Sequence, residues 1–271
     1  MVDVKKYIAS VSFGKDSLAM LLYILENRLP LDEVVFYDTG MEFSAIYLIR
    51  DKVKCLLKDT SVKYVELQPP RPFEFDMLIR EKTKRDGTIV NGDGWCGGAC
   101  RWGTFIKQNV INKYTTGAHV YVGIAADESS RLANLDYYKS SPIADAGMTE
   151  SDCLDYCRQR GYSWLEKSRV SPSGYVDLYD ILDRVSCWCC SNKNRKELKN
   201  MYAFLPDYWE RLKALQSKID MPMKKWSNKR FGDYGNVFDM ERVFELELQN
   251  ESTNDKLHEY TELDIKNDAA E

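Results

Sequence analysis

Histidine is almost absent from this chain, whose 271 residues include only His119 and His258. Because histidine is the commonest metal ligand in proteins, a metal site built on the chain's clustered cysteines must consist mostly of thiolates. The chain has eight cysteines, and several of them lie close together in sequence. In a cytosolic protein, clustered cysteines indicate metal or redox chemistry rather than a framework of disulfides.

Long apolar runs are also absent. A membrane-spanning helix needs about 20 predominantly apolar residues in succession, and no segment approaches that length. The first residues, MVDVKKY, lack the hydrophobic stretch of a secretory signal peptide. We therefore expect a cytoplasmic protein with no membrane partner.

A strong excess of charge of one sign is missing as well. The formal net charge is −4, and residues 249–271 carry much of the acidity. No global positive field therefore argues for a nucleic acid as partner. One local segment, Lys224–Tyr234, interleaves basic and aromatic side chains and could stack on bases and pair with phosphates. A nucleic-acid partner thus stays open beside the simpler interpretation of a solvated basic loop.

Apolar runs and amphipathic segments alternate along the first half of the chain and predict strands and helices in turn. The predicted strands span residues 4–11, 33–37, 62–67 and 119–124. The predicted helices span residues 17–27, 43–58, 73–82 and 101–114, with a glycine-rich loop at 85–98. This order predicts an α/β fold with a doubly wound, mostly parallel sheet and right-handed crossovers.

The composition divides the chain into three parts. Residues 1–190 are predicted to form the α/β domain, and residues 191–248 a small helical region with apolar residues at helical spacing. Residues 249–271 are polar and acidic, and we expect them to form a flexible tail.

The turn Ser12–Ser17 joins the first predicted strand to the first predicted helix. Backbone N–H groups point outward at the start of a helix, where the helix dipole also favours negative charge. Gly14 lets the backbone approach a ligand closely, while Lys15 adds a positive charge and the two serines add hydroxyl groups. The turn is therefore predicted to bind a phosphate or a pyrophosphate.

Local sequence alone leaves an alternative open for this turn. Ser12 or Asp16 could simply cap the helix. The turn is also not a Walker A loop, because Asp16 follows Gly14-Lys15 where that motif has serine or threonine.

Three segments in order resemble the phosphoadenosine phosphosulfate (PAPS) reductase-like members of the N-type ATP pyrophosphatases, within the adenine nucleotide alpha-hydrolase superfamily. The turn Ser12–Ser17 resembles their pyrophosphate loop, and Asp38–Phe43 resembles their Asp-Thr-Gly segment. Gly123–Arg131 resembles their Gly-Ile-Arg-x-x-x-Ser-x-x-Arg segment. The resemblance implies an adenine nucleotide, bound by Ser12, Phe13, Gly14, Lys15, Asp16, Ser17, Asp38, Thr39, Gly40, Gly123, Ile124 and Ser129.

The resemblance also implies roles in catalysis for Lys15, Asp16, Asp38 and Arg131. Lys15 would stabilise a departing pyrophosphate, and Asp16 or Asp38 would help to place Mg²⁺. Arg131 would neutralise an anionic group of the substrate; its simpler alternative is a surface ion pair. The family's arginine after Gly-Ile is Ala125 here, which argues against a PAPS-like ligand and favours ATP.

Two short cysteine pairs are separated by a long stretch of chain. Cys96 and Cys100 form a C-x3-C pair, and Cys187 and Cys190 form a C-x2-C pair with Cys189 inside it. Such pairs can converge on one metal ion, each pair supplying two ligands. The alternative is two unrelated sets of buried thiols.

A similar arrangement occurs in the adenylylsulfate reductases and is implied in DNA phosphorothioation enzymes of the same superfamily. This likeness implies a [4Fe–4S] cluster held by Cys96, Cys100, Cys187 and Cys190, with Cys189 as a substitute ligand. A structural Zn²⁺ held by four thiolates is the alternative. For Cys153 and Cys157, four residues apart on a predicted helix, we expect core packing.

We therefore expect an enzyme that binds ATP with Mg²⁺, adenylates an acceptor substrate, and takes part in sulfur transfer. A PAPS or adenylylsulfate reductase is the alternative, although no cysteine follows Cys190 to serve as its nucleophile. A non-catalytic subunit that binds nucleotide or nucleic acid is a third interpretation. The acceptor, a sulfur-donor protein as partner, and a homo-oligomer all stay open.

Overall fold

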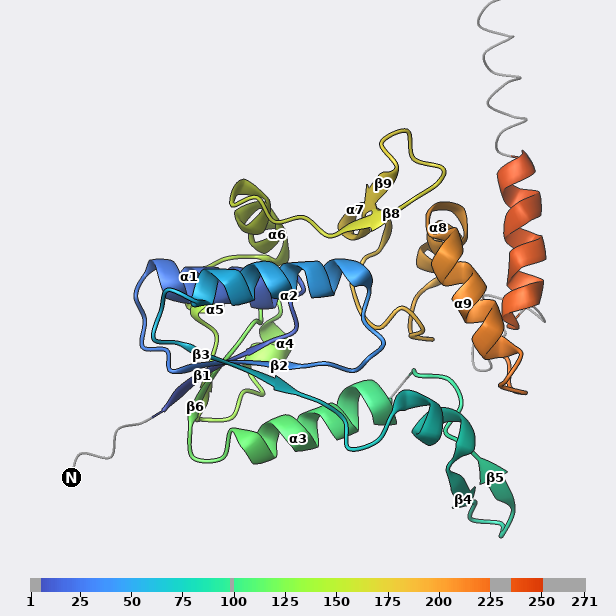
Figure 1. The fold of residues 1–271 in the computed structure, drawn as a ribbon, viewed down its shortest axis with the longest axis horizontal. Coiled ribbons are helices and arrows are strands. Elements are labelled where there is room, and N and C mark those ends of the chain that lie inside the picture. Colours follow the sequence, from blue (N-terminus) through green and yellow to red (C-terminus); the bar gives the residue numbers. More distant parts are fainter. Residues whose placement is uncertain (1–5, 98–99, 225–234, 251–271) are drawn as a thin grey trace, which may run out of the picture. The chain divides into compact units, whose positions relative to one another are not determined.

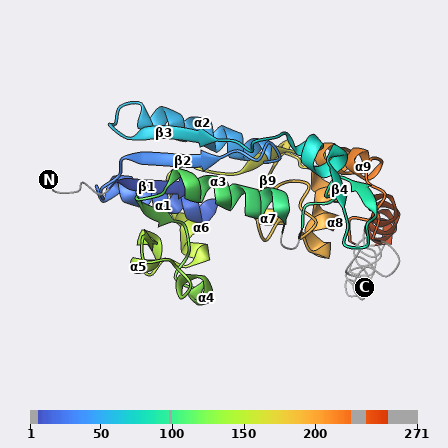
Figure 2. The same cartoon turned by 90° about the horizontal axis from the view of Figure 1, so that it is seen from below.

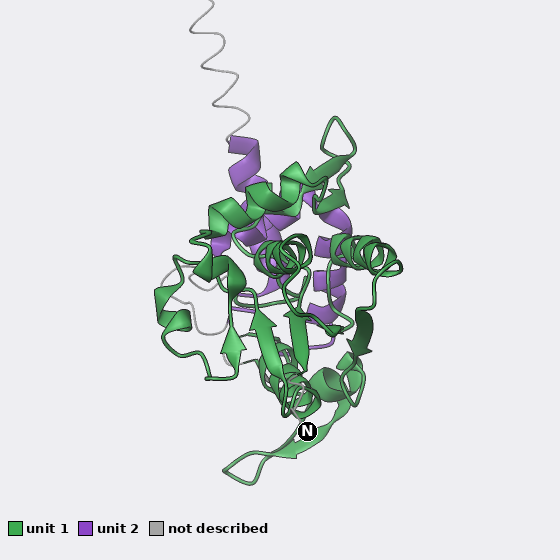
Figure 3. Cartoon of the chain, turned by 90° about the vertical axis from the view of Figure 1, so that its left-hand side faces the viewer, with its two compact units in different colours: residues 1–192 green, residues 193–271 purple. Residues whose placement is uncertain are grey.

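A computed structural model of the protein describes residues 6–97, 100–224 and 235–250. The chain divides into two compact units, Met1–Asn192 and Lys193–Glu271, which Figure 3 colours separately. Each unit is described by itself below. The predicted tail lies outside the described residues beyond residue 250.

A five-stranded sheet forms the centre of the first unit, and all of its strand pairs are parallel. In spatial order the strands are β3 (Lys63–Leu67), β2 (Glu33–Tyr37), β1 (Tyr7–Val11), β6 (His119–Val122) and β7 (Lys139–Ser140). The predicted α/β class with a parallel sheet is confirmed.

Helices cover both faces of this sheet. Figure 1 shows α1 and α2 on one face and α3 on the other, and Figure 2 shows the same layers from below. The longer helices are α1 (Lys15–Glu26), α2 (Ser44–Leu57), α3 (Lys107–Tyr114) and α6 (Glu150–Gln159). Single-turn helices are α4 (Ser129–Leu132), α5 (Pro142–Asp145) and α7 (Leu178–Ile181).

The buried strand β2 lies in the middle of the hydrophobic core. Every residue of β2 is buried, as expected for a strand of a parallel sheet that is covered on both faces. Ile8 of β1 and Val35 of β2 pack together with Ala118 at the start of β6. The continuous apolar residues of these strands therefore correctly indicated that the strands are buried.

The direction of strand addition reverses between β1 and β6. The chain runs outward from β1 through β2 to β3, and then returns to place β6 on the other side of β1. In open α/β sheets, ligands bind beyond the carboxyl ends of the strands at such a switch point. The topology therefore directs attention to the segments that follow β1 and β6.

Residues 73–97 follow their prediction in part. A helical segment is present at 73–79 and includes the π-helix η1 (Phe75–Ile79), but it ends before residue 82. The antiparallel hairpin β4 (Glu81–Thr83) and β5 (Ile89–Asn91) was not predicted. Gly92 has a positive φ, and a Cβ there would lie 2.0 Å from the Met77 carbonyl oxygen. Strands of three residues offer too few alternating positions for a period of two to be recognised.

The helix predicted at 101–114 is present with those bounds, and its first part is the π-helical segment η2 (Arg101–Ile106) before α3. A short hairpin, β8 (Leu165–Lys167) and β9 (Tyr175–Asp177), follows α6 and was not predicted.

The second unit is helical, as the sequence predicted. It contains α8 (Arg195–Phe204), α9 (Pro206–Gln216) and a further helix at residues 237–250. Trp209 packs edge-on against Tyr202 and Phe244, which joins these helices through one aromatic cluster. None of the described helices is long and apolar enough to cross a membrane.

Truncation of the core strand β1 tests the packing. We expect Ile8→Ala to lower the free energy of unfolding by about 2–5 kcal/mol, because it removes buried methyl groups and leaves a cavity. Leu48→Ala on the exposed side of α2, where the side chain is 60% exposed, should change it by no more than about 0.5 kcal/mol. Denaturant unfolding of the two variants measures the difference, and equal values would contradict the described core.

Candidate active site

The turn between β1 and α1 is anchored in the core by Phe13. This residue has a φ of 59° and a fully buried side chain that packs against Phe36, with ring centroids 4.9 Å apart. The Trp164 Nε1 donates a hydrogen bond of 2.7 Å to the Phe13 carbonyl. A positive φ is uncommon for a residue other than glycine, so these contacts hold the turn in its shape. Phe13, expected to contact a nucleotide, instead places its side chain in the core.

Hydroxyl groups close the turn from within. The Ser17 Oγ accepts a hydrogen bond from the Ser12 N–H at 3.1 Å and donates one to the Gly14 carbonyl at 3.1 Å. The Ser12 and Ser17 hydroxyl oxygens are also 3.1 Å apart. The two serines therefore shape the turn as well as lining it.

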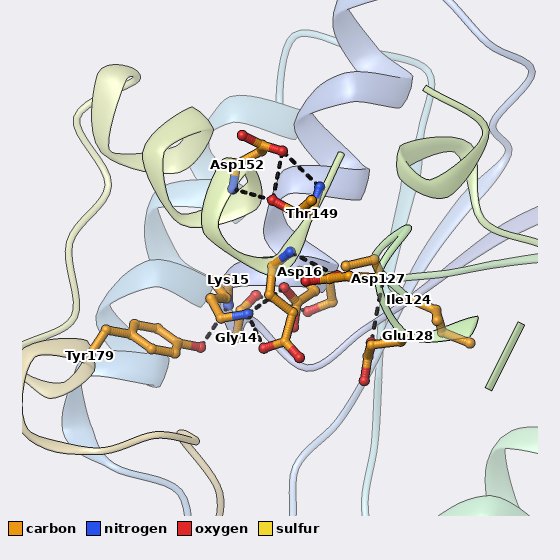
Figure 4. Close-up of polar contacts among 12 residues, drawn as sticks. Gly14, Lys15, Asp16, Ile124, Asp127, Glu128, Thr149, Asp152 and Tyr179 are labelled. Atoms are coloured by element: carbon orange, nitrogen blue, oxygen red, sulfur yellow. Dashed lines mark hydrogen bonds and ion pairs between the residues drawn. The ribbon is translucent and has the colours of Figure 1, made fainter. Parts of the chain in front are cut away.

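The first N–H groups of α1 face outward from the turn. Among the described residues, no group accepts a hydrogen bond from the N–H of Gly14, Asp16 or Ser17. The N–H of Lys15 donates to the Tyr179 hydroxyl at 2.8 Å, as Figure 4 shows. Unpaired N–H groups at a helix start attract anions, so this turn has the donors that an anionic ligand requires.

The Lys15 side chain is buried and pairs with two carboxylates. Its Nζ lies 2.8 Å from Asp16 Oδ1 and 2.7 Å from Glu150 Oε2. Burial alone would lower the pKa of Lys15, but the hydrogen bonds to Asp16 and Glu150 outweigh it and raise the pKa. Burial raises the pKa of Asp16, and the charges of Glu150 and Glu128 add to this effect against the influence of Lys15.

The end of β6 lies against the start of α1. A Cβ on Gly123 would lie 2.5 Å from the Ser17 Cα and 2.6 Å from its N, so only glycine fits there. The next residue, Ile124, is buried, and its N–H and carbonyl both hydrogen-bond the Ser141 hydroxyl. Gly123 therefore lines the predicted site, whereas Ile124 is buried beneath it and bonded to Ser141.

The segment after β6 contains a local ion pair. Glu128 accepts a hydrogen bond from the Ala125 N–H and pairs with the Arg131 guanidinium. Arg131 is exposed at the edge of the site in this ion pair, while Ser129 is exposed at the start of α4. Ala125, at the position of the family's arginine, is completely buried.

A cavity of about 210 Å³ lies where these segments meet; we call it the loop cavity. It opens at the carboxyl ends of β1 and β6, which is the switch point of the sheet. Its lining consists of residues of the turn at 12–17 together with further basic and acidic side chains. The lining residues are Ser12, Gly14, Lys15, Asp16, Ser17, Gly123, Glu128, Arg131, Glu150, Tyr179, Asp183, Arg184 and Val185.

Asp38, Thr39 and Gly40 line a different cavity, which we call the turn cavity. It has a volume of about 410 Å³ and lies at the carboxyl ends of β2 and β3, with Trp102 and residues 68–74 as its other walls. The Asp38 Oδ1 accepts hydrogen bonds from the Gly40 N–H and the Tyr47 hydroxyl. The structure therefore divides most of the predicted nucleotide-binding residues between two cavities, whereas Phe13, Ile124 and Ser129 line neither of them.

The two cysteine pairs approach one another in the fold. Cys96 and Cys190 form a β-bridge, and a Cβ on Gly103 would lie 3.9 Å from the sulfurs of both Cys100 and Cys187. The Cys187 Sγ also lies 3.6 Å from the Thr39 Oγ1 of the turn cavity. Segments about 90 residues apart thus form one cluster of thiols.

The thiols of this cluster affect one another's ionisation. The hydrogen bond with Cys96 and the N–H of Gly103 lower the pKa of Cys100 to about 6. Hydrogen bonds to Cys100 and Cys189, together with burial, raise the pKa of Cys96. In the described part of the chain, no group of three or more histidine, cysteine or acidic side chains is arranged to hold a metal ion.

Comparison with known proteins identifies the first part of the chain. Residues 6–84 match the phosphoadenosine phosphosulfate reductase domain. The match begins at β1 and includes both the turn at 12–17 and the Asp38–Gly40 segment. The resemblance inferred from the motifs is confirmed.

A relative of this chain occurs in Methanocaldococcus jannaschii and is described as an uncharacterized protein. The two sequences are 23% identical over 208 residues, which is 76% of this chain and 40% of the relative. The chain therefore spans less than half the length of that relative.

The sequence motifs did not reveal two residues of the loop cavity, Tyr179 and Glu150. Both contact Lys15, yet they lie 164 and 135 positions further along the chain. A capping box of Thr149 and Asp152, visible in Figure 4, starts α6 beside Glu150 and was a readable signal of a helix start. The predicted basic segment Lys224–Tyr234 lies outside the described residues beyond Lys224.

The contact of Gly123 with α1 can be tested by adding one methyl group. We expect Gly123→Ala to lower the free energy of unfolding by about 1–3 kcal/mol, because the Cβ would overlap the backbone of Ser17. Gly103→Ala is the matched control, since its nearest atoms lie 3.9 Å away. Thermal and denaturant unfolding measure both variants, and equal stabilities would contradict the close approach of β6 to α1.

Proposed function

We propose that this protein binds ATP at the loop cavity and adenylates an acceptor substrate as a step in sulfur transfer. An acceptor oxygen attacks the α-phosphorus of ATP, the bond from that phosphorus to the bridging oxygen breaks, and pyrophosphate leaves. The match to the PAPS reductase domain supports nucleotide-related sulfur chemistry in general. The observation that carries the finer proposal is the set of open N–H groups beside buried Lys15 at the switch point.

The size of the loop cavity supports binding of the phosphate end of a nucleotide. Ligand pockets for whole drug-sized molecules usually measure about 300–1,000 Å³, and this cavity measures about 210 Å³. The N–H groups of Gly14, Asp16 and Ser17 would bind the oxygens of the leaving pyrophosphate, and Lys15 would neutralise part of its charge.

The charge of the loop cavity supports a nucleotide that arrives with Mg²⁺. The lining contains the cations Lys15, Arg131 and Arg184, and the carboxylates Asp16, Glu128, Glu150 and Asp183. A free triphosphate would therefore enter a cavity whose acidic side chains already outnumber its basic ones. Mg²⁺ usually binds to one or two carboxylates together with substrate phosphates, and when bound it would shield the charge that develops on them.

Asp16 fits the role of Mg²⁺ ligand better than Asp38 does. Asp16 lines the loop cavity beside Glu128 and Glu150. Asp38 lines the turn cavity, and its Oδ1 already accepts two hydrogen bonds within its own segment.

The buried position of Ala125 favours ATP over a phosphosulfate nucleotide. Ala125 is 0% exposed and contributes no charge to the site. In the related enzymes an arginine at this position would pair with the anionic groups that distinguish PAPS from ATP. Ala125 offers those groups no such partner in this protein.

We also propose that the cysteine cluster binds a metal centre, with a [4Fe–4S] cluster favoured over zinc. The backbone of Cys190 bridges that of Cys96, the sulfurs of Cys100 and Cys187 both lie near Gly103, and Cys189 is in hydrogen-bonding reach of Cys96. Because the described side chains form no ready-made group of ligands, the thiols would have to turn toward a common centre to hold it. The pKa of Cys100 is lowered, as suits a thiolate ligand, whereas hydrogen bonds with Cys100 and Cys189 raise the pKa of Cys96 and burial raises that of Cys187. When bound, the centre would supply sulfur or electron-transfer chemistry next to Thr39.

Removal of the Lys15 charge tests the nucleotide proposal. We expect Lys15→Met to weaken the binding of Mg-ATP and of inorganic pyrophosphate about tenfold to a hundredfold, because a hydrogen bond to a charged group contributes about 1.5–3 kcal/mol. Calorimetric titration of anaerobically purified protein measures both affinities. Lys107→Met at the start of α3 is the matched control and should bind as the wild type does.

The reaction itself has a separate readout. With Mg²⁺, ATP and a panel of acceptors, the wild type should release pyrophosphate in a Lys15-dependent manner. ATP binding without pyrophosphate release for any acceptor would contradict adenylation, and sulfite release from PAPS would assign the protein to the reductases instead.

Metal analysis tests the cysteine cluster. We expect anaerobically purified protein to be brown, to contain iron and acid-labile sulfide, and to lose most of both in Cys190→Ser, because a thiolate ligand is removed. Cys55→Ser, at an exposed cysteine on α2, should retain the iron. A colourless protein with one zinc per chain would refute the iron–sulfur assignment, and protein free of both metals would refute the metal centre.

A further inference from the structure

Tyr179 is held beside the turn at 12–17 by Trp164 and Asp177, which lie far from that turn in sequence. Its ring packs edge-on against Trp164, with centroids 4.7 Å apart, and Trp164 itself donates to the Phe13 carbonyl. The Asp177 side chain accepts from the Tyr179 N–H at 2.9 Å and thereby caps the helical turn α7. The same aromatic pair thus positions both the tyrosine and the turn.

The Tyr179 hydroxyl uses only its accepting capacity within the described structure. Its oxygen accepts the hydrogen bond from the Lys15 N–H, and no described group accepts the hydroxyl proton. Burial raises the pKa of Tyr179, so the hydroxyl keeps that proton at neutral pH. Tyr179 lines the loop cavity, where the proton is available to a ligand.

The tyrosine leaves the rest of the turn accessible. It takes the N–H of Lys15 alone, whereas the N–H groups of Gly14, Asp16 and Ser17 have no acceptor among the described residues. A hydroxyl that accepts a hydrogen bond becomes a better donor, because hydrogen bonds in a chain polarise one another. A ligand could therefore accept hydrogen bonds both from the free N–H groups at the start of α1 and from the Tyr179 hydroxyl, which the Lys15 N–H polarises.

We propose that Tyr179 is a phosphate-binding residue that extends the donor set of the turn. Its hydroxyl accepts from the Lys15 N–H and donates its own proton to an oxygen of the ligand's di- or triphosphate group. This assignment rests on the proposed function of the loop cavity. It adds a residue from α7 to a site otherwise built from β1, α1 and β6.

Removal of the Tyr179 hydroxyl tests the assignment. We expect Tyr179→Phe to weaken the binding of inorganic pyrophosphate, in the presence of Mg²⁺, about tenfold to a hundredfold, because a charge-assisted hydrogen bond is lost while the ring still packs on Trp164. Calorimetric titration measures the affinity, and the thermal midpoint shows whether the fold is intact. Tyr175→Phe is the matched control, because Tyr175 is 48% exposed and lies outside the loop cavity.

Whether Tyr179→Phe weakens or strengthens pyrophosphate binding shows whether the hydroxyl donates to the ligand or only blocks the turn. If the hydroxyl only blocked the turn, Tyr179→Phe would free the Lys15 N–H and bind pyrophosphate more tightly. Tighter or unchanged binding therefore overturns the assignment. A loss of affinity in Lys15→Met without a loss in Tyr179→Phe refutes this inference alone, whereas a wild type that binds no pyrophosphate refutes the proposed function itself.

Discussion

The close contact between Gly123 and the first residues of α1 is the constraint on which the loop cavity depends. A side chain at position 123 would overlap the backbone of Ser17, so β6 can end beside the turn only with glycine there. That contact brings the segment with Glu128 and Arg131 to the same opening as Lys15. The parallel pairing of β1 with β6 brings the end of β6 close to the start of α1, and the absence of a side chain on Gly123 leaves room for this contact.

Electrostatic balance is the second principle of the site. Lys15 is buried at the start of α1, and burial of an unpaired ammonium group would be costly. Asp16 and Glu150 remove that cost by pairing with it. A ligand phosphate would have to compete with these carboxylates for Lys15, and an accompanying divalent cation would give the carboxylates a new partner.

A single stretch of chain joins the loop cavity to the cysteine cluster. Tyr179 and residues 183–185 line the cavity, and Cys187 follows two residues later in the cluster. Thr39 contacts Cys187 on the side of the turn cavity. Both cavities and the thiols therefore lie at the carboxyl edge of one sheet, where parallel strands place the segments that follow them.

Local patterns of residues were enough to predict the strand, turn and helix around Lys15, the parallel sheet and the cysteine pairs, because each depends on a few neighbouring residues. Only the tertiary structure placed the Phe13 side chain in the core and Asp38 in a separate cavity. It also brought Glu150 and Tyr179 to Lys15 from 135 and 164 positions away. Such contacts depend on the path of the chain between distant elements, which no local pattern of residues encodes.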